Sequence, residues 1–307
     1  MNLKSFLSFL FALIAIFLIF AYWFLPFNTT EFFQYSNNNN YNFSLNSSNN
    51  SMMQFYENLR YSDSNISYKI SDDCEEFKKT SITDSFNTLS NLTILNFYPV
   101  QENEEISAFC SDRTRPTENG FFVAGEGGPI NITKLDKFNL IQHGEITLIK
   151  ESKCKVPLIG IHEILHALGF DHSENPNSVM YPTSNCNQEI GEDIINKINE
   201  LYSYPSYPDL DFENVSAVMR GKFLDSNVSI RNNGFVKSNN SQVVIYADDK
   251  KVKSFDVNPM EAGYGFEISL SNIFVSKINF NEIKFEIVYS EPELEKTNNK
   301  IKLEIKK

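Results

Sequence analysis

The chain has 307 residues, of which 41% are apolar and 21% are charged. These fractions are those of a folded protein, so disorder throughout is excluded, and the length suits about two domains. The 27 basic and 39 acidic residues give a net charge of −12. Because such a chain repels phosphate, nucleic acid is not expected as a partner.

An uncharged, apolar segment lies close to the amino end, from Phe6 to Leu25. At about 1.5 Å per residue, it is long enough to cross a hydrocarbon core of roughly 30 Å. Lys4 precedes it, and no Lys or Arg follows until Arg60. The positive-inside rule therefore predicts a single-pass anchor in the cell membrane over residues 1–27, with the amino terminus inside and the rest of the chain outside. The alternative is a signal peptide whose cleavage gives a secreted protein.

Asn and Ser dominate residues 28–56, which follow the apolar segment. Too little apolar surface is present there to offset the entropy lost on ordering. The sequence therefore predicts a linker.

Four cysteines lie beyond the linker, and an even number outside the cell suggests two disulfides with three connectivities. Cys154 and Cys186 bracket the histidine motif described below, so we favour that pair, with Cys74–Cys110 as the other. No C-x-x-C spacing is present, which makes metal binding by these cysteines the weaker interpretation.

One helix and several strands are expected between the linker and the histidine motif. Asp72 or Asp73 can cap a helix that runs to about Leu89. Strand-like runs occur at 92–98, 105–109, 120–124 and 145–149. The glycine-rich stretch 124–129 is predicted to be a turn; the alternative is that it borders an edge strand along which an extended substrate pairs.

Residues 162–172 read H-E-I-L-H-A-L-G-F-D-H and contain three of the chain's four histidines. A helix is expected over 156–168, because Ile161, Ile164, Leu165 and Leu168 form an apolar stripe. His162 and His166 then project from one face, one turn apart, as two ligands of a zinc ion.

The rest of the motif completes a metal site of the catalytic type. Gly169 suits a left-handed helix end, and the turn that it makes can return His172 as the third ligand. Three protein ligands leave the fourth position of the zinc ion open to water. Glu163 lies beside the first ligand and is predicted to be the general base, and then the general acid, of metal-assisted hydrolysis.

The motif resembles that of the metzincin zinc proteases, and Ser173 after the third histidine narrows the resemblance to matrixins. Residues 178–182 are similar to the matrixin Met-turn. This resemblance implies that Met180 lies beneath the zinc and that Tyr181 and Pro182 belong to a wall of the substrate pocket. It also implies one catalytic Zn²⁺ and cleavage within peptide chains. Calcium is a further candidate ion, without assigned residues.

The resemblance implies a metzincin-like catalytic domain over residues 57–204, with a mixed, twisted sheet and three helices. A helix expected over 189–202 is similar to the last helix of that domain. No segment resembling the matrixin cysteine switch, P-R-C-G-x-P-D, precedes the domain.

A second domain is expected over residues 205–307. Two prolines in 204–208 break the preceding helix, and beyond them apolar residues alternate with polar ones in about seven short runs. This pattern predicts an immunoglobulin-like β-sandwich. The loops at 232–234 and 293–299 resemble those of CARDB-type adhesion modules, which implies a spacer or a module that binds a surface protein or glycan.

The sequence as a whole predicts an α+β fold: an N-terminal transmembrane helix, a metzincin-like domain and an all-β sandwich. The function that it favours is a membrane-anchored, extracytoplasmic zinc endopeptidase acting on peptides or proteins. Two alternatives are a zinc hydrolase for peptide ends or non-peptide amides, and a surface adhesion protein with a vestigial zinc domain.

Overall fold

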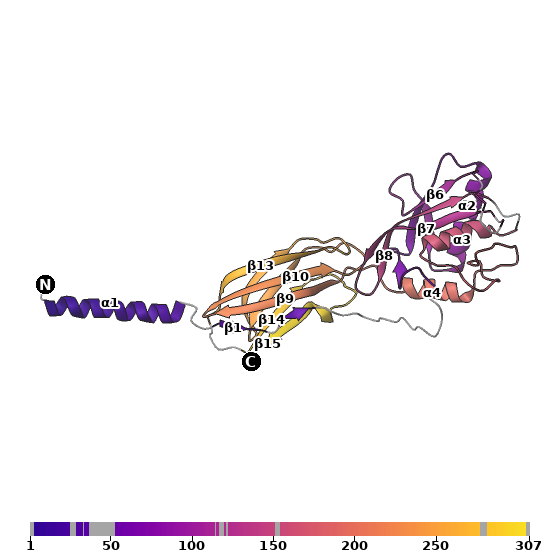
Figure 1. The fold of residues 1–307 in the computed structure, drawn as a ribbon. Helices are drawn as coiled ribbons and strands as arrows, with labels where there is room; N and C mark the ends of the chain where they lie inside the picture. The colour runs from indigo at the N-terminus through magenta and orange to yellow at the C-terminus, as the bar shows by residue number, and fades with distance from the viewer. Residues whose placement is uncertain are drawn as a thin grey trace. The chain divides into compact units, whose positions relative to one another are not determined.

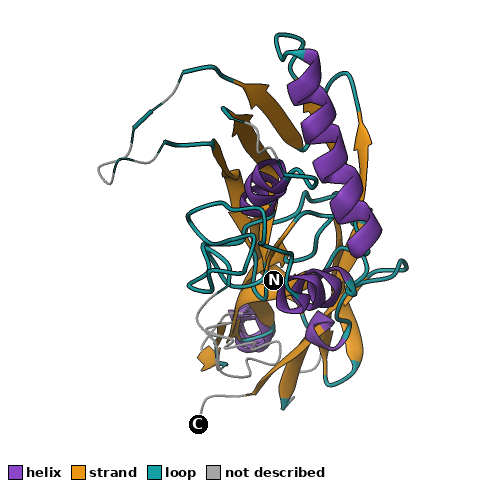
Figure 2. Ribbon diagram, turned by 90° about the vertical axis from the view of Figure 1, so that its right-hand side faces the viewer, coloured by secondary structure: helices purple, strands orange, loops and turns teal. Residues whose placement is uncertain are grey.

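The structure is a computed structural model that describes residues 3–24, 29–32, 34–36, 53–113, 115–116, 120, 122–150, 154–276 and 281–304. The chain divides into two compact units. One contains residues 41–207 and is called the inserted unit, because the other, the sandwich unit, contains residues 1–40 and 208–307. The inserted unit combines helices with strands, whereas the sandwich fold is built from strands (Figures 1 and 2). The expected α+β content is therefore confirmed.

A mixed sheet forms the framework of the inserted unit. Its strands run in the spatial order β3-β8-β6-β4-β5, all parallel, and β7 pairs with β8 in the antiparallel direction. The strands are β3 (Leu59–Arg60), β4 (Asn65–Ile70), β5 (Asn96–Pro99), β6 (Ile106–Cys110), β7 (Gly125–Lys134) and β8 (Asn139–Leu148). Apart from β8, no strand in the described part of the chain pairs with β7, so β7 lies at an edge of the sheet.

Three helices accompany this sheet: α2 (Glu76–Leu92), α3 (Leu158–Ala167) and α4 (Glu192–Tyr202) (Figure 1). A buried arginine ties α4 to the sheet. The Arg60 guanidinium donates hydrogen bonds to the carbonyls of Leu201 at 2.7 Å and Tyr204 at 3.0 Å. The Leu201 carbonyl lies in the last turn of α4 and the Tyr204 carbonyl lies just beyond it. Carbonyls at the end of a helix have no amide partner within the helix. Burial lowers the pKa of Arg60, and the contacts with carbonyl oxygens satisfy its donors.

The structure corrects two predictions in the first half of this unit. The helix is not capped by Asp72 or Asp73: its N-cap is Glu75, which makes no side-chain capping bond. Since α2 continues to Leu92, the strand expected from residue 92 begins only at Asn96.

The glycine-rich stretch is a strand, so the prediction of a turn is wrong. The strand expected at 120–124 is also wrong, because β7 begins at Gly125 and continues to Lys134. Glycine disfavours strands by itself, but pairing with β8 along the whole length of β7 overrides that preference.

Two disulfides brace the inserted unit in the connectivity favoured from the sequence. Cys74 pairs with Cys110 and Cys154 pairs with Cys186, with Cα–Cα distances of 5.2 and 5.3 Å. The second bridge closes a loop that contains all three motif histidines.

Two antiparallel sheets make up the sandwich. One has the order β1-β9-β10-β13, with β2 also on β9, and the other has the order β12-β11-β14-β15. Phe212 and Phe285, both fully buried, meet edge to face in the core between them. The strands of the first sheet are β1 (Thr29–Glu31), β2 (Tyr35–Ser36), β9 (Leu210–Arg220), β10 (Phe223–Asn232) and β13 (Gly265–Phe274). Those of the second are β11 (Ser241–Ala247), β12 (Lys250–Val257), β14 (Glu282–Val288) and β15 (Lys300–Glu304), which follows a short 3₁₀ helix, η1 (Thr297–Asn299).

Part of the predicted linker belongs to the sandwich, so that prediction is wrong for residues 29–32 and 34–36. Thr29 pairs with Arg220, and Tyr35 pairs with Val215. Phe32 between them is 6% exposed in the sandwich core. The high Asn and Ser content of the whole segment hid these apolar side chains, and their partner strand lies far away in sequence. The prediction is also wrong at its far end, because Gln54 is 3% exposed and the Phe55 amide donates to the Gly169 carbonyl of the inserted unit at 2.9 Å. Residues 28, 33 and 37–52 of the predicted linker lie outside the described residues.

The amino-terminal helix α1 (Leu3–Phe24) is long and apolar enough to cross a membrane. Its most apolar part, Lys4–Ala21, has a mean hydropathy of 2.4, and 6% of that part is buried. It is the single such helix among the described residues. A signal sequence near the amino terminus would pass the same test of length and composition.

Candidate active site

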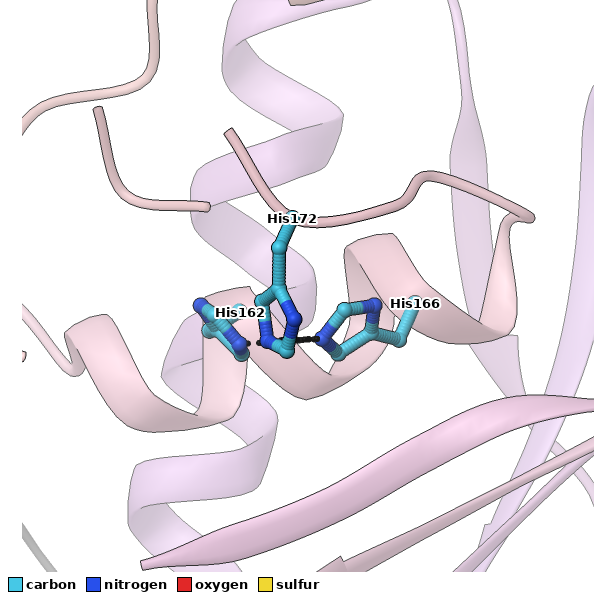
Figure 3. A group of neighbouring side chains, drawn as sticks. All are labelled: His162, His166 and His172. Carbon is cyan, nitrogen blue, oxygen red and sulfur yellow. Dashed lines mark hydrogen bonds between the residues drawn. The ribbon is translucent and has the colours of Figure 1, made fainter. Parts of the chain in front are cut away.

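Helix α3 and the turn after it bring the three motif histidines together. The helix is buried on nearly every side, and His162 and His166 lie one turn apart on it. Gly169 follows with φ of +93°, a left-handed conformation that favours glycine. A Cβ at this position would also lie 2.8 Å from the Leu59 side chain. The turn returns the chain so that His172 faces the helix (Figure 3).

The three imidazoles converge through the same ring atom. His166 Nε2 lies 3.0 Å from His162 Nε2 and 3.2 Å from His172 Nε2. Three nitrogens at about 2.0–2.1 Å from one tetrahedral ion would be roughly 3.3 Å apart. The observed separations are close to this value, and no other group of three or more His, Cys, Asp or Glu among the described residues has such geometry. The donor set therefore fits a zinc ion.

Backbone carbonyls orient two of the rings. Nδ1 of His162 donates to the Val179 carbonyl at 2.6 Å, and Nδ1 of His166 donates to the Phe170 carbonyl at 2.8 Å. Since a carbonyl can only accept, the proton lies on Nδ1 and the Nε2 lone pair is free for a metal. Burial lowers the pKa of both rings, that of His166 to about 4, with the neighbouring rings adding to the effect. Both rings are therefore neutral at neutral pH and can act as metal ligands.

Glu163 is 5% exposed and lies under strand β7. A Cβ at Gly125 would lie 2.5 Å from Oε1 of Glu163, and one at Gly127 would collide with the Glu163 carbonyl. The two glycines thus allow the edge strand to pass directly over the helix (Figure 1). Burial, together with the negative charge of Glu126, raises the pKa of Glu163 to about 8 in the metal-free chain. A dication at the histidines would lower it.

Met180 lies in the loop that follows the histidines. It is 1% exposed, and its carbonyl accepts a hydrogen bond from the Ser173 amide at 2.8 Å. The preceding residue supplies the carbonyl that orients His162. Tyr181 is partly exposed and Pro182 is exposed, so both are open to solvent beside this turn.

Sequence reasoning missed Glu126 and the carbonyls of Val179 and Phe170. Glu126 is ion-paired with Arg115, Oε1 to Nη1 at 2.7 Å, and no spacing rule connects either residue to the motif. His143, the remaining histidine, lies on β8 away from the group, with Nε2 at 3.3 Å from Ser107 Oγ.

Comparison with known proteins agrees with this geometry. Residues 58–203 match the matrixin family model. This match implies a zinc metalloprotease domain. Residues 207–303 match the CARDB family model. The resemblances to matrixins and to CARDB modules are therefore confirmed.

One solved structure with similarity to this chain is a CARDB domain from Pyrococcus furiosus, crystallised in complex with di-metal ions. It is 15% identical, with a TM-score of 0.27, and the match covers 32% of this chain and 87% of that one. No curated protein matches the chain.

Proposed function

We propose that the chain is a membrane-anchored, extracytoplasmic zinc endopeptidase. The observation that supports this function best is the convergence of three imidazole Nε2 atoms at zinc spacing, with a buried carboxylate, Glu163, adjacent to the first of them. His162, His166 and His172 would hold one zinc ion, with Met180 packed in the loop behind them.

A zinc ion bound there would polarise the scissile carbonyl and acidify a water molecule. Glu163 then takes a proton from the attacking water and delivers it to the leaving amine. Burial raises the pKa of Glu163 and the charge of a bound zinc ion would lower it, so the two effects oppose each other at the group that exchanges the proton.

The substrate class follows from the edge strand. β7 runs over Glu163 and pairs on one side with β8, so its other side can align an extended peptide by main-chain hydrogen bonds. Such alignment needs residues on both sides of the cleaved bond, which favours cleavage within chains over cleavage at their ends. Tyr181 and Pro182 are proposed to form part of the pocket wall beside the cleavage site.

The anchoring part of the proposal is supported by the length and composition of α1 and by the absence of Lys and Arg between Lys4 and Arg60 in the sequence. Together these favour an inserted unit on the outer side of the membrane. Binding of a surface protein or glycan by the sandwich stays a prediction.

The test uses the full chain in detergent, with zinc measured by elemental analysis and cleavage measured with end-blocked, quenched peptides. Wild type and Glu163→Gln are both expected to hold zinc stoichiometrically, and only wild type is expected to cleave. Glu145→Gln is the matched control, since this glutamate lies partly exposed on β8. Absence of zinc from wild type, or full activity in Glu163→Gln, would overturn the proposal. Faster cleavage of free dipeptides would favour a peptidase for chain ends.

A further inference from the structure

The chain connects α1 to a particular end of the sandwich. α1 ends at Phe24, and β1 begins at Thr29, paired with Arg220 at the end of β9. Five residue steps span at most about 18 Å, at 3.3–3.6 Å for each step. The β9–β10 turn, which follows Arg220 directly, is therefore tethered within about that distance of the end of α1.

The direction of pairing fixes which end of the sandwich this is. β1 and β2 are antiparallel to β9, so the chain moves from Arg220 towards Asn214 as it leaves the anchor. β9 extends a further four residues to Leu210. With about 3.3 Å per residue, the far end of β9 is roughly 33 Å from the tethered end.

The tethered end carries an exposed aromatic pair. Phe223 opens β10 and Phe274 closes β13, and the two residues are directly opposite each other, with ring centroids 6.0 Å apart. Phe274 is 51% exposed and Phe223 is partly exposed. Strands β9, β10 and β13 lie side by side in one sheet, so this pair is adjacent to the β9–β10 turn (Figure 1).

Charge at this end has both signs. Arg220 is 3.4 Å from Asp225. The β11–β12 turn lies at the same end, because Lys250 contacts Ser276 just after β13. This turn also contains Asp248 and Asp249. This mixture gives no preference for anionic lipid over neutral lipid. Apolar rings, by contrast, gain free energy at the boundary between headgroups and acyl chains of any phospholipid.

We propose that the tethered end of the sandwich rests on the bilayer that holds α1 and inserts Phe223 and Phe274 at the phospholipid interface. This proposal depends on the proposed membrane anchor and is independent of proteolysis. The sandwich, although last in the sequence, is then the membrane-contacting domain, and two points hold it there: the covalent tether and the aromatic pair.

The test introduces one indole at a time into full-length chain in phosphatidylcholine vesicles. Trp23 is the one tryptophan of the sequence, so Trp23→Phe provides a silent background. Phe274→Trp reports on the tethered end. Tyr264→Trp is the matched control, because Tyr264 is 68% exposed and precedes the opposite end of β13. Vesicles with brominated acyl chains quench an indole that reaches them.

Emission from Phe274→Trp is expected to fall about twofold in brominated vesicles, because interfacial side chains insert roughly 5–10 Å into the acyl boundary. Emission from Tyr264→Trp is expected to stay unchanged. Flotation with the vesicles is measured first: a chain that does not float refutes the anchor itself. A chain that floats without quenching of Phe274→Trp, or with equal quenching of both indoles, overturns the proposal. A blue shift of Phe274→Trp without quenching would assign the aromatic pair to contact between copies instead.

Discussion

The two closely spaced glycines of β7 lead to a sharp prediction about Glu163, the proposed general base. Gly125→Ala would place a methyl group 2.5, 2.6 and 2.7 Å from Oε1, Cγ and Cδ of Glu163. Ordinary contacts of a Cβ begin near 3.4 Å. The side chain of Glu163 must therefore move by about 1 Å, the difference between 3.4 and 2.5 Å.

A displacement of about 1 Å in a catalytic group can lower the rate about 100-fold, equivalent to about 2.7 kcal/mol in the activation free energy. We therefore expect kcat/KM of Gly125→Ala on an internal peptide to fall about 100-fold. Zinc content should not change, since the three atoms nearest the added methyl group all belong to Glu163 and none to a histidine. The assay combines peptide cleavage with elemental analysis on the same samples.

Gly128→Ala is the control, because it lies on the same strand and its Cβ would meet no atom within 4 Å. It carries the same change in strand propensity and conformational entropy without the clash. Equal losses in the two variants would mean that β7 as a whole is disturbed. Full activity of Gly125→Ala would refute the assigned position of Glu163.

Four further predictions concern stability and association. In the metal-free chain, the pKa of Glu163 is about 8 in the folded state, against an ordinary value of 4.5, so stability falls as pH rises between these values. The advantage of Glu163→Gln in unfolding free energy should thus grow from about pH 5 to about pH 8, as measured by denaturant unfolding; a constant difference contradicts the argument. Replacing Cys154 and Cys186 by Ser should cost about 3–4 kcal/mol, because the bridge closes a 32-residue separation; an unchanged denaturation midpoint would argue against the bridge. Phe32→Ala should destabilise the sandwich by about 3 kcal/mol, since it empties a core position. A chain that starts at residue 53 lacks β1 and β2 and so exposes the edge of β9. It should associate through that edge in light scattering, whereas a chain that starts at residue 29 should not.

The convergence of the three histidines could be predicted from the sequence because its determinants are local. His162 and His166 are separated by one helical turn, and Gly169 has the one conformation that returns His172. No information about distant parts of the chain is needed to bring these side chains together. The disulfide across this region followed from the same local reasoning.

The features that could not be predicted depend on pairing between distant segments. Gly125 and Gly127 indicate a turn by their own preferences, whereas pairing with β8 places them in a strand and the close approach of α3 leaves no room for a larger side chain there. Phe32 lies in an Asn-rich and Ser-rich segment, and its burial depends on a strand that begins at Leu210. Glu126 influences Glu163 through space, across a sheet edge that the sequence pattern did not reveal.

The pairing of β1 with β9 also determines when the sandwich can be completed during synthesis. Thr29 and Arg220 are 191 positions apart, the difference between 220 and 29. During synthesis, residues 29–36 emerge from the ribosome before the inserted unit and have no partner until β9 has been made. By that time the whole inserted unit is available to fold. Contacts of such separation form late and slowly. The inserted unit is therefore expected to reach its folded state before the sheet edge next to α1 is closed, so that assembly of the sandwich is the last step of biogenesis.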